Sequence, residues 1–509
     1  MPARTTKAAE TTTRRRRRST SVAATETTGV SKPKSARSTK QEVVENNKEF
    51  FDIGQMLDEL QDETDKKYGL VSSVLERSSD RMSTGILSLD LLLYGGIQPG
   101  GWYTIYGPEQ SAKSTLAMTI LAQALHARMT KGSKFACGIF DYEGSVDEEY
   151  TGNIIKSLGI KGNAAQIFGV RDDDGGWEIP PLARYYSHDV GDDFFKALAK
   201  IRRGLPDKQT INGEPCYLFE HTKANKSKFA GMYDTKYLSR NNKIKVPAPD
   251  GFMQGLYLCD SYPAMLPDGL DDDDRNSGMA EQARMFSEGI KKVKGGMRKK
   301  AMTVIGINQL RLRPATMFGN PEYEPCGEAL KFFSDVRIKS TPRSTGPSGF
   351  VVNKGIVEEP SVTGRGKDTY RFLRLKTTKN KLGGMPQQEC WARIWISDGT
   401  GTARGLDPAF DTFEYLSLLG MVSGNKNNYK FSEDCPLHGA KKIDWITFKK
   451  LVLCAPKEIK AICEEQGIKP VKIRDWCQKR CANGSHPKLF KEILVSAATG
   501  GKKTDDDDD

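Results

Sequence analysis

The sequence predicts an α/β fold with a mainly parallel sheet, and two observations support this prediction. A glycine-containing loop joins an aromatic, β-branched run at 102–106 to a helical stretch at 116–129. Apolar runs at 135–140 and 256–259 are each followed by an acidic residue. Acids at the carboxyl ends of parallel strands lie where ligands bind in such sheets. We therefore expect a binding site at the carboxyl edge of the sheet.

The loop after the first run matches the phosphate-binding pattern G-x-x-x-x-G-K-[ST], except that Ala112 replaces the second glycine. Its N–H groups and the following helix N-terminus form a cradle for phosphate. Lys113 is expected to reach the β- and γ-phosphates of ATP, and the Ser114 hydroxyl to bind Mg²⁺. A negative φ at Ala112 would cost little, whereas a positive φ would strain the loop. The expected nucleotide-binding residues are Gly107, Pro108, Glu109, Gln110, Ser111, Ala112, Lys113, Ser114 and Thr115.

The alternative for this loop is a strand-to-helix turn that contains Gly and Lys by chance, and Ala112 is its main support. Two acids favour the nucleotide site. Asp260 ends an apolar strand, as expected for a Walker B acid directed at Mg²⁺. Glu143 follows the strand at 135–140 and could orient an attacking water, although an acid there could also cap the next helix.

Composition narrows the class of protein. The chain has 509 residues, enough for two or three domains, and a net charge of +12. Residues 1–40 carry +9 of that charge, so the rest carries only +3 and says little about partners. No apolar run approaches the roughly 20 residues of a membrane span, and none near the N-terminus resembles a secretory signal. Ten scattered Cys residues suit a reducing compartment, so we expect a cytoplasmic protein.

Changes in composition divide the chain. The arginine-rich N-terminal tail is expected to be disordered. It could serve as a nucleic-acid-binding arm or a targeting signal, or it could be a solvated tail. An apolar stripe at 50–60 predicts a helix that packs on its own core or docks on a neighbour. The expected regions are the tail 1–46, an oligomerisation segment 47–82, the core 83–400 with an insertion at 170–250, a small α-rich domain 401–500 and an acidic tail 501–509.

The insertion mixes aromatic and basic side chains in its later part. Such a mixture can stack on bases and neutralise phosphates, but a surface excursion with its own small core is the favoured interpretation. A separate possibility concerns zinc. Cys435, His438, Cys477, Cys481 and His486 have passable ligand spacing, yet ordinary residues of a small helical domain explain them better.

Taken in order, several motifs resemble those of the RecA family of recombinases. They are STGILSLDLLLYGG, GPEQSAKST, FDYEGSVDEEY, LCDS, GMAEQARM, INQLRLRPATMFGNPE, EALKFFSDVR and TTKNKLGG. The match covers roughly residues 66–400 and is broken by 170–250. The length and the divergent loops look more like a phage-encoded RecA/UvsX type. The resemblance implies a RecA-like P-loop ATPase core with an N-terminal docking helix.

The resemblance also implies roles for single residues. Glu143 matches the glutamate that activates water, and Gln309 the glutamine that senses the γ-phosphate. Asp147 and Tyr150 match residues that hold the adenine. Lys379 and Lys381 match a lysine pair that reaches the neighbouring subunit's ATP. With Lys113, the expected catalytic residues are therefore Glu143, Gln309, Lys379 and Lys381.

Two DNA-binding loops follow from the same resemblance, at 268–279 and 310–331. Cys326 departs from the family there, because it stands where a Gly approaches DNA. The expected DNA-binding residues are Met279, Arg284, Arg311, Arg313, Met317, Phe318 and Lys331.

The resulting hypothesis is an ATP-dependent recombinase that forms a homo-oligomeric filament on single-stranded DNA and pairs it with double-stranded DNA. ATP and Mg²⁺ would lie at subunit interfaces, and single-strand-binding and mediator proteins are possible partners. If phage-encoded, the protein would act in the cytoplasm of a bacterial host. The alternatives are a hexameric RecA-fold DNA helicase or branch-migration motor, and a DNA-coating protein without turnover.

Overall fold

The computed structural model describes residues 81–131, 135–187, 189–211, 213–248, 253–268, 275–312, 322–347, 350, 355–363, 366–383, 387–397 and 405–482. Every described residue belongs to one compact unit of the chain, Val71–Asp509. The basic tail, the helix expected at 50–60 and the acidic tail lie outside the described residues.

A ten-stranded mixed sheet forms the centre of the described chain, in the order β17-β16-β15-β13-β1-β10-β9-β2-β5, with β14 paired to β15. All pairs from β13 to β5 are parallel, and the pairs made by β14–β17 are antiparallel. The parallel strands are β1 (Trp102–Gly107), β2 (Ala136–Asp141), β5 (Arg184–Ser187), β9 (Gly255–Asp260), β10 (Met302–Gln309) and β13 (Val336–Arg343). The antiparallel strands are β14 (Ile356–Pro360), β15 (Lys367–Asn380), β16 (Gln388–Ser397) and β17 (Gly405–Leu406).

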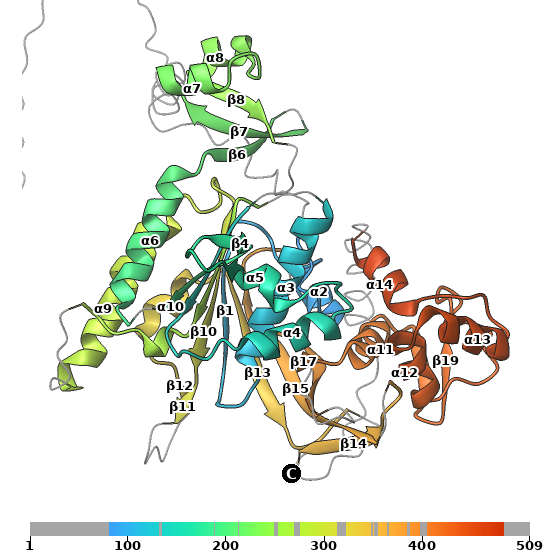
Figure 1. The fold of residues 1–509 in the computed structure, drawn as a ribbon. Coiled ribbons are helices and arrows are strands. Elements are labelled where there is room, and N and C mark those ends of the chain that lie inside the picture. The colour runs from blue at the N-terminus through green and yellow to red at the C-terminus, as the bar shows by residue number, and fades with distance from the viewer. Residues whose placement is uncertain are drawn as a thin grey trace, which may run out of the picture. The chain divides into compact units, whose positions relative to one another are not determined.

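Helices cover both faces of this sheet (Figure 1). Alternate residues of each buried strand face opposite layers. Tyr103 and Ile105 join the core under α3, α4 and α5, whereas Trp102 joins the core under α6, α9 and α10. The first layer contains α2 (Leu87–Leu92), α3 (Lys113–Lys131), α4 (Glu148–Ser157) and α5 (Ala164–Phe168). The second contains α6 (Gly191–Gly204), η1 (Tyr262–Ala264), α9 (Arg275–Lys294) and α10 (Gly327–Phe333).

This architecture confirms the predicted α/β class with a mainly parallel sheet. The strands expected at 102–106, 135–140 and 256–259 are β1, β2 and β9. Helix α9 begins at Arg275 and ends at Lys294. Gly295 and Gly296 follow directly, and Gly296 has a left-handed φ of 100°, so the helix cannot continue.

The segment 170–250 contributes to the main body as well as to a smaller sheet. Strand β5 is the edge of the main sheet, and α6 covers one of its faces. A separate three-stranded antiparallel sheet, β6-β7-β8, follows α6. The elements are β3 (Val170–Arg171), β4 (Trp177–Ile179), β6 (Asp207–Ile211), β7 (Glu214–Glu220), α7 (Lys223–Lys228), α8 (Thr235–Asn241) and β8 (Lys243–Pro247).

The C-terminal region shares an aromatic core with the antiparallel end of the main sheet. Arg393 of β16 is fully buried there and forms ion pairs with Glu359 at 3.1 Å and Asp407 at 2.6 Å. Lys449, also buried, lies 3.4 Å from both Glu359 and Asp368. The elements are α11 (Pro408–Leu418), β18 (Val422–Asn425), β19 (Asn428–Phe431), α12 (Trp445–Leu453), α13 (Pro456–Gln466) and α14 (Ile473–Ala482).

Candidate nucleotide site

The phosphate loop and three functional side chains reach one edge of the sheet because the parallel strands end together. Gly107 pairs with Gln309 across β1 and β10, and Asp141 pairs with Asp260 across β2 and β9. The backbone N–H of Leu310 continues this ladder by donating to the Gly107 carbonyl at 2.9 Å. The carboxyl edge therefore carries the phosphate-loop sequence, two carboxylates and a glutamine side by side.

The loop between β1 and α3 is held closely by β13. A Cβ atom added at Gly107 would lie 2.0 Å from the Ser340 carbonyl oxygen, so only glycine fits. The Ser340 hydroxyl donates to the Ser111 carbonyl at 2.5 Å. The first glycine of the motif is thus required by close backbone approach, which is the usual reason for glycine in such a loop.

Ala112 has a φ of +56°, and Gln110 has a φ of +54°. This is the strained alternative of the two considered from sequence, because a Cβ in the left-handed region costs roughly 1–2 kcal/mol. Glycine, which the motif normally has at 112, would adopt this conformation without that cost. The loop therefore keeps a glycine-like backbone although the side chain has changed.

Lys113 begins α3, and its side chain lies against the loop. The ammonium group donates to the Pro108 carbonyl at 2.7 Å and lies 3.4 Å from the Ser111 hydroxyl. Burial lowers the pKa of Lys113, and the carboxylates of Glu143 and Asp260 partly oppose that effect. The structure thus places a buried cation within the phosphate loop, as the motif requires.

Asp260 is buried, and its Oδ1 has no hydrogen-bond partner among the described residues. The Ser114 side chain hydrogen-bonds to this carboxyl group. Burial raises the pKa of Asp260 to about 6, and nearby Glu143 and Asp141 add to the increase. Buried polar atoms are rarely left unpaired. A carboxylate oxygen without a partner beside a serine hydroxyl suits a hard divalent cation, so these residues fit the Mg²⁺ expected from sequence.

Glu143 lies in the loop after β2 and contacts two neighbouring strand ends. Its Oε1 accepts a hydrogen bond from Gln309 Nε2 at 3.1 Å and another from the Ser261 hydroxyl. Its carboxylate is exposed to solvent. The structure therefore brings together the predicted water-activating glutamate and the predicted γ-phosphate sensor within one chain.

Asp141 fixes the loop that carries Glu143. Its Oδ1 accepts from the N–H of Glu143 at 3.1 Å and of Ser145 at 3.3 Å, and its Oδ2 accepts from Val146 N–H at 3.0 Å. The Tyr185 hydroxyl donates to the same Oδ2 at 3.0 Å. Sequence reasoning assigned no role to Asp141, Ser261 or Tyr185. The strand-end position was a signal for Asp141, whereas nothing in the sequence linked Tyr185 to it.

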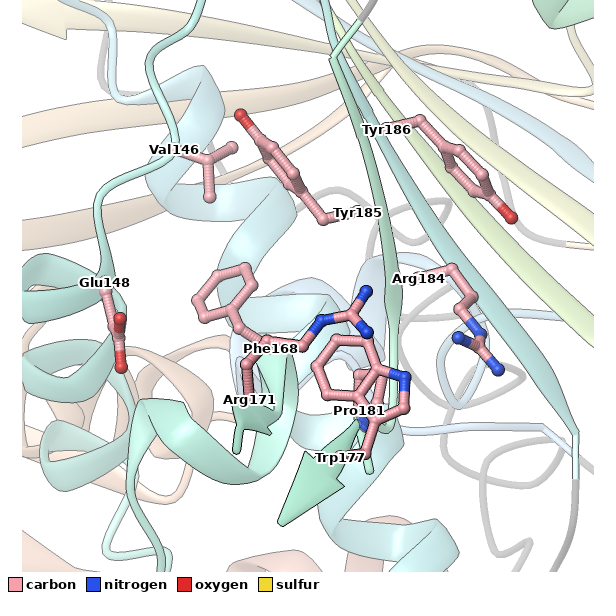
Figure 2. A pocket seen from close by; sticks show the side chains of 9 residues that line it. All are labelled: Val146, Glu148, Phe168, Arg171, Trp177, Pro181, Arg184, Tyr185 and Tyr186. Carbon is pink, nitrogen blue, oxygen red and sulfur yellow. The ribbon is translucent and has the colours of Figure 1, made fainter. Parts of the chain in front are cut away.

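A cavity of about 680 Å³ lies beyond this loop, against edge strand β5 (Figure 2). Tyr185 and Tyr186 project from opposite faces of β5, and the Arg171 guanidinium stacks on Trp177 with its carbon 3.7 Å from the ring centre. Val146 and Glu148 contribute to the wall. The cavity and the candidate site thus share the loop 141–148.

The two residues expected at the adenine lie at the start of α4. The Asp147 side chain caps this helix by accepting from Tyr150 N–H. The Tyr150 hydroxyl is 2.8 Å from the Thr115 hydroxyl, so it contacts the helix of the phosphate loop. Contact with adenine stays a prediction for both residues.

Lys379 and Lys381 do not reach the nucleotide site of their own chain. Lys379 pairs with Arg337 at the start of β13, the sheet edge opposite the phosphate loop. Its ammonium group donates to the carbonyls of Lys331 at 2.6 Å and Phe332 at 2.8 Å, at the end of α10. Burial lowers the pKa of Lys379 to about 8, with a contribution from Lys381. Any contact between these lysines and ATP has to be made across an interface.

The expected DNA-binding residues are only partly described. Arg313, Met317 and Phe318 lie outside the described residues, as does the side chain of Met279 in α9. Arg284 forms an ion pair with Glu288 at 2.9 Å, and Lys331 one with Glu328 at 2.6 Å. Arg311 lies in β11 (Arg311–Leu312), which pairs with β12 (Glu322–Tyr323). Together β11 and β12 form the base of the second predicted loop.

Cys326 precedes α10 with a left-handed φ of +71°, which explains why a glycine would suit this position. The zinc hypothesis gains no support. Within the described ranges no group of three or more His, Cys, Asp or Glu side chains could hold a metal ion, and His486 lies outside them. Cys435, Cys477 and Cys481 are buried, and the His438 ring contacts the Phe431 carbonyl at 2.9 Å.

Comparison with known proteins agrees with this geometry. The model of the RecA N-terminal domain family matches residues 55–175 and 253–346. The chain is 26% identical to Protein RecA of Mycoplasma mobile over 344 residues, which are 66% of this chain and 76% of the relative. It is 28% identical to Protein RecA of Pseudomonas fluorescens (strain Pf0-1) over 371 residues, 71% of this chain and 79% of the relative.

A crystal structure of the RadB recombinase aligns with 64% of this chain and 98% of its own, at 16% identity and a TM-score of 0.34. The sheet and its edge site define a P-loop nucleotide-binding protein with a RecA-like core. By the family match and the curated relatives, the chain is similar to the RecA family of recombinases. The relatives named here are bacterial, and the phage-type assignment stays a prediction. In the described part of the chain no helix is both long and apolar enough to cross a membrane.

Proposed function

We propose that the protein is an ATP-dependent DNA recombinase that assembles as a helical filament on single-stranded DNA and exchanges it with a homologous duplex. The hydrogen bond from Gln309 to Glu143 is the observation that carries this proposal. Gln309 is the last residue of β10, and the chain continues from it into the second predicted DNA loop. One contact therefore joins the group that would activate water to the segment that would hold DNA.

ATP hydrolysis is the proposed chemistry. Lys113 and the N–H groups of the loop would bind the phosphates. Ser114 and Asp260 would hold Mg²⁺, which neutralises phosphate charge when bound. Glu143 would orient the attacking water and accept its proton, a role that fits an exposed carboxylate held by Gln309 and Ser261.

Assembly is needed to complete the proposed site. Lys379 and Lys381 lie at the opposite sheet edge, so they would neutralise charge on the ATP of a neighbouring subunit, as an arginine finger does. ATP binding would then stabilise contacts between subunits, and hydrolysis would release DNA. The DNA-free protein is expected to hydrolyse ATP slowly because its sites are incomplete.

ATP hydrolysis measured with and without single-stranded DNA tests the proposal, together with negative-stain imaging in a slowly hydrolysed ATP analogue. DNA-stimulated hydrolysis and long helical filaments are the expected result. Closed rings that unwind a forked duplex would favour the helicase or branch-migration motor. DNA binding that is the same with and without ATP, together with no ATP hydrolysis, would favour a DNA-coating protein in which Ala112 has abolished turnover.

A further inference from the structure

The small sheet β6-β7-β8 and its two helices fall in the gap between the stretches that match the RecA N-terminal domain, 55–175 and 253–346. The match to the family model therefore assigns this segment no role. The sheet has a core of its own, made by Cys216, Leu218, Ile244 and Val246. The segment is thus a folded addition to the core.

Helix α7 is unusual because it buries no side chain. Its sequence is KANKSK, and Lys223, Lys226 and Lys228 are all exposed. Most helices in proteins are stabilised by burying an apolar face, which α7 lacks. Lys236 on α8 is exposed as well. We refer to Lys223, Lys226, Lys228 and Lys236 as the lysine surface.

Both helices are anchored at the same end of the small sheet (Figure 1). The Asn225 side chain of α7 donates to the carbonyl of Glu220, the last residue of β7, at 2.9 Å. Asn242, which ends α8, contacts His221 at 2.7 Å. Glu220 pairs with Lys243, the first residue of β8. These contacts place the four lysines around one end of the sheet.

The charges of the lysine surface are not compensated. None of its four lysines forms an ion pair within the described residues. The nearby acids are Glu220 and Asp234, and the Asp234 carboxylate is engaged in capping α8 through two backbone N–H groups. Asp207, at the start of β6, pairs instead with Lys243 at 3.4 Å and Lys300 at 2.9 Å. Exposed cations that lack ion-pair partners and are held together by a folded segment attract polyanions.

We propose that the lysine surface binds the sugar-phosphate backbone of DNA, and specifically the duplex that enters strand exchange. The proposal rests on the proposed recombinase function. Lysine ammonium groups contact phosphates without reading bases, so binding at this surface is independent of sequence. Duplex DNA is favoured as the source because the family resemblance assigns the single strand to residues 268–279 and 310–331.

The test is fluorescence anisotropy of the full-length protein with a labelled duplex and a labelled oligothymidylate of equal length, over a salt series of about 50–200 mM. The variant combines Lys223→Gln, Lys226→Gln and Lys228→Gln. The plot of log affinity against log salt for duplex should lose up to about 2.7 of its slope, at about 0.9 per phosphate contact. DNA-stimulated ATP hydrolysis on oligothymidylate should stay at the wild-type rate.

The matched control combines Lys156→Gln, Lys161→Gln and Lys457→Gln, which removes three exposed charges elsewhere. This control should keep the wild-type slope. Equal losses in both variants would indicate a general charge effect and overturn the proposal, as would an unchanged slope in the first variant. A loss confined to oligothymidylate would support the surface but assign it to single-stranded DNA.

Folding and function are separated by two further measurements. A single charge reversal, Lys226→Glu, should weaken duplex binding without altering the unfolding temperature, because no side chain of α7 is buried. Wild-type protein that neither hydrolyses ATP with DNA nor forms filaments would refute the recombinase function. The salt slopes would still decide whether the lysine surface binds DNA.

Discussion

Gln309 Nε2 donates a hydrogen bond to Glu143 Oε1 at 3.1 Å, joining the end of β10 to the loop after β2. The two residues are 166 positions apart in the sequence. Both stand at the carboxyl edge of the sheet, so a shift of either strand end changes the contact. This geometry makes the pair a direct test of coupling between nucleotide and DNA.

Replacing Gln309 with Ala should separate these two activities. We expect ATP affinity to stay near the wild-type value, because the Gln309 side chain donates to Glu143 and not to a phosphate-loop side chain among the described residues. The stimulation of hydrolysis by single-stranded DNA should disappear, leaving only the DNA-independent rate. Steady-state hydrolysis with and without DNA measures this, and full stimulation in the variant would refute the coupling role.

Glu143→Gln and Lys113→Ala should have different consequences. Glu143→Gln keeps a hydrogen-bonding side chain but removes the base, so turnover should fall by about 10²–10⁴ with ATP binding retained. Lys113→Ala removes the buried cation of the loop and should abolish ATP binding. Equilibrium binding of a fluorescent ATP analogue, read beside hydrolysis, distinguishes them. Equal loss of binding in both variants would contradict the assigned roles.

Ala112→Gly should stabilise the protein by up to about 1.6 kcal/mol. Relief of the left-handed Ala112 recovers roughly 1–2 kcal/mol, and the added flexibility of glycine in the unfolded chain removes roughly 0.4–1 kcal/mol. Thermal unfolding measures the difference. Ala127→Gly within α3 is the control and should destabilise by about 1 kcal/mol, as glycine does inside a helix. Destabilisation by both substitutions would show that Ala112 is unstrained.

The raised pKa of Asp260 predicts opposite effects of pH on stability and on metal binding. Its folded pKa of about 6 exceeds the ordinary value of 3.8. Its stabilising contribution is therefore fully present below pH 3.8 and lost as the pH rises through about 6. Asp260→Asn should thus stabilise the nucleotide-free protein at pH 8, by up to about 3 kcal/mol.

The same substitution should remove the stabilisation by Mg²⁺ and ATP, because the amide cannot replace a carboxylate ligand. In the wild-type protein, that stabilisation should decline below about pH 6, where Asp260 becomes protonated. Thermal shifts at pH 5 and pH 8, with and without Mg²⁺ and ATP, measure both effects. A variant that is less stable than wild type at pH 8 would argue against burial as the cause of the shifted pKa.

Tyr185→Phe tests how the loop 141–146 is held. The substitution removes one hydrogen bond to Asp141 Oδ2 and leaves the ring in the cavity wall. We expect kcat to fall, with the KM for ATP nearly unchanged, because Asp141 positions Glu143 and not the phosphates. Tyr186→Phe on the opposite face of β5 is the control. Similar kcat values for both variants would show that the hydrogen bond from Tyr185 to Asp141 does not help to position Glu143.

Sequence patterns predicted β1, β2 and β9 of the parallel sheet because each is a short apolar run with a clear end. The acids at those ends, Asp260 and Glu143, could be found for the same reason. The contact between Glu143 and Gln309 depends on strand order, which spacing along the chain does not reveal. The conformation of Ala112 was also open, because its φ is imposed by packing of the loop against β13.

The role of Lys379 came from the family resemblance, which assigns it to the ATP of a neighbouring subunit. Strand β15 places Lys379 at the far sheet edge of its own chain, away from that chain's phosphate loop. Contact with a neighbouring subunit's ATP stays a prediction. The contact between Tyr185 and Asp141 could not be predicted, because polar contacts between distant strands carry no local sequence pattern.

The buried ionic cluster around Arg393 links the unfolding of the C-terminal region to that of the sheet. Asp407 and Lys449 from the C-terminal region pair there with Arg393, Glu359 and Asp368 of the sheet. Removing one partner of a buried ion pair typically costs about 3–5 kcal/mol. A chain truncated after residue 404 would leave Arg393 without Asp407 and Asp368 without Lys449. The C-terminal helices should therefore melt together with the sheet in a single calorimetric transition, and proteolysis should not release them as an intact fragment.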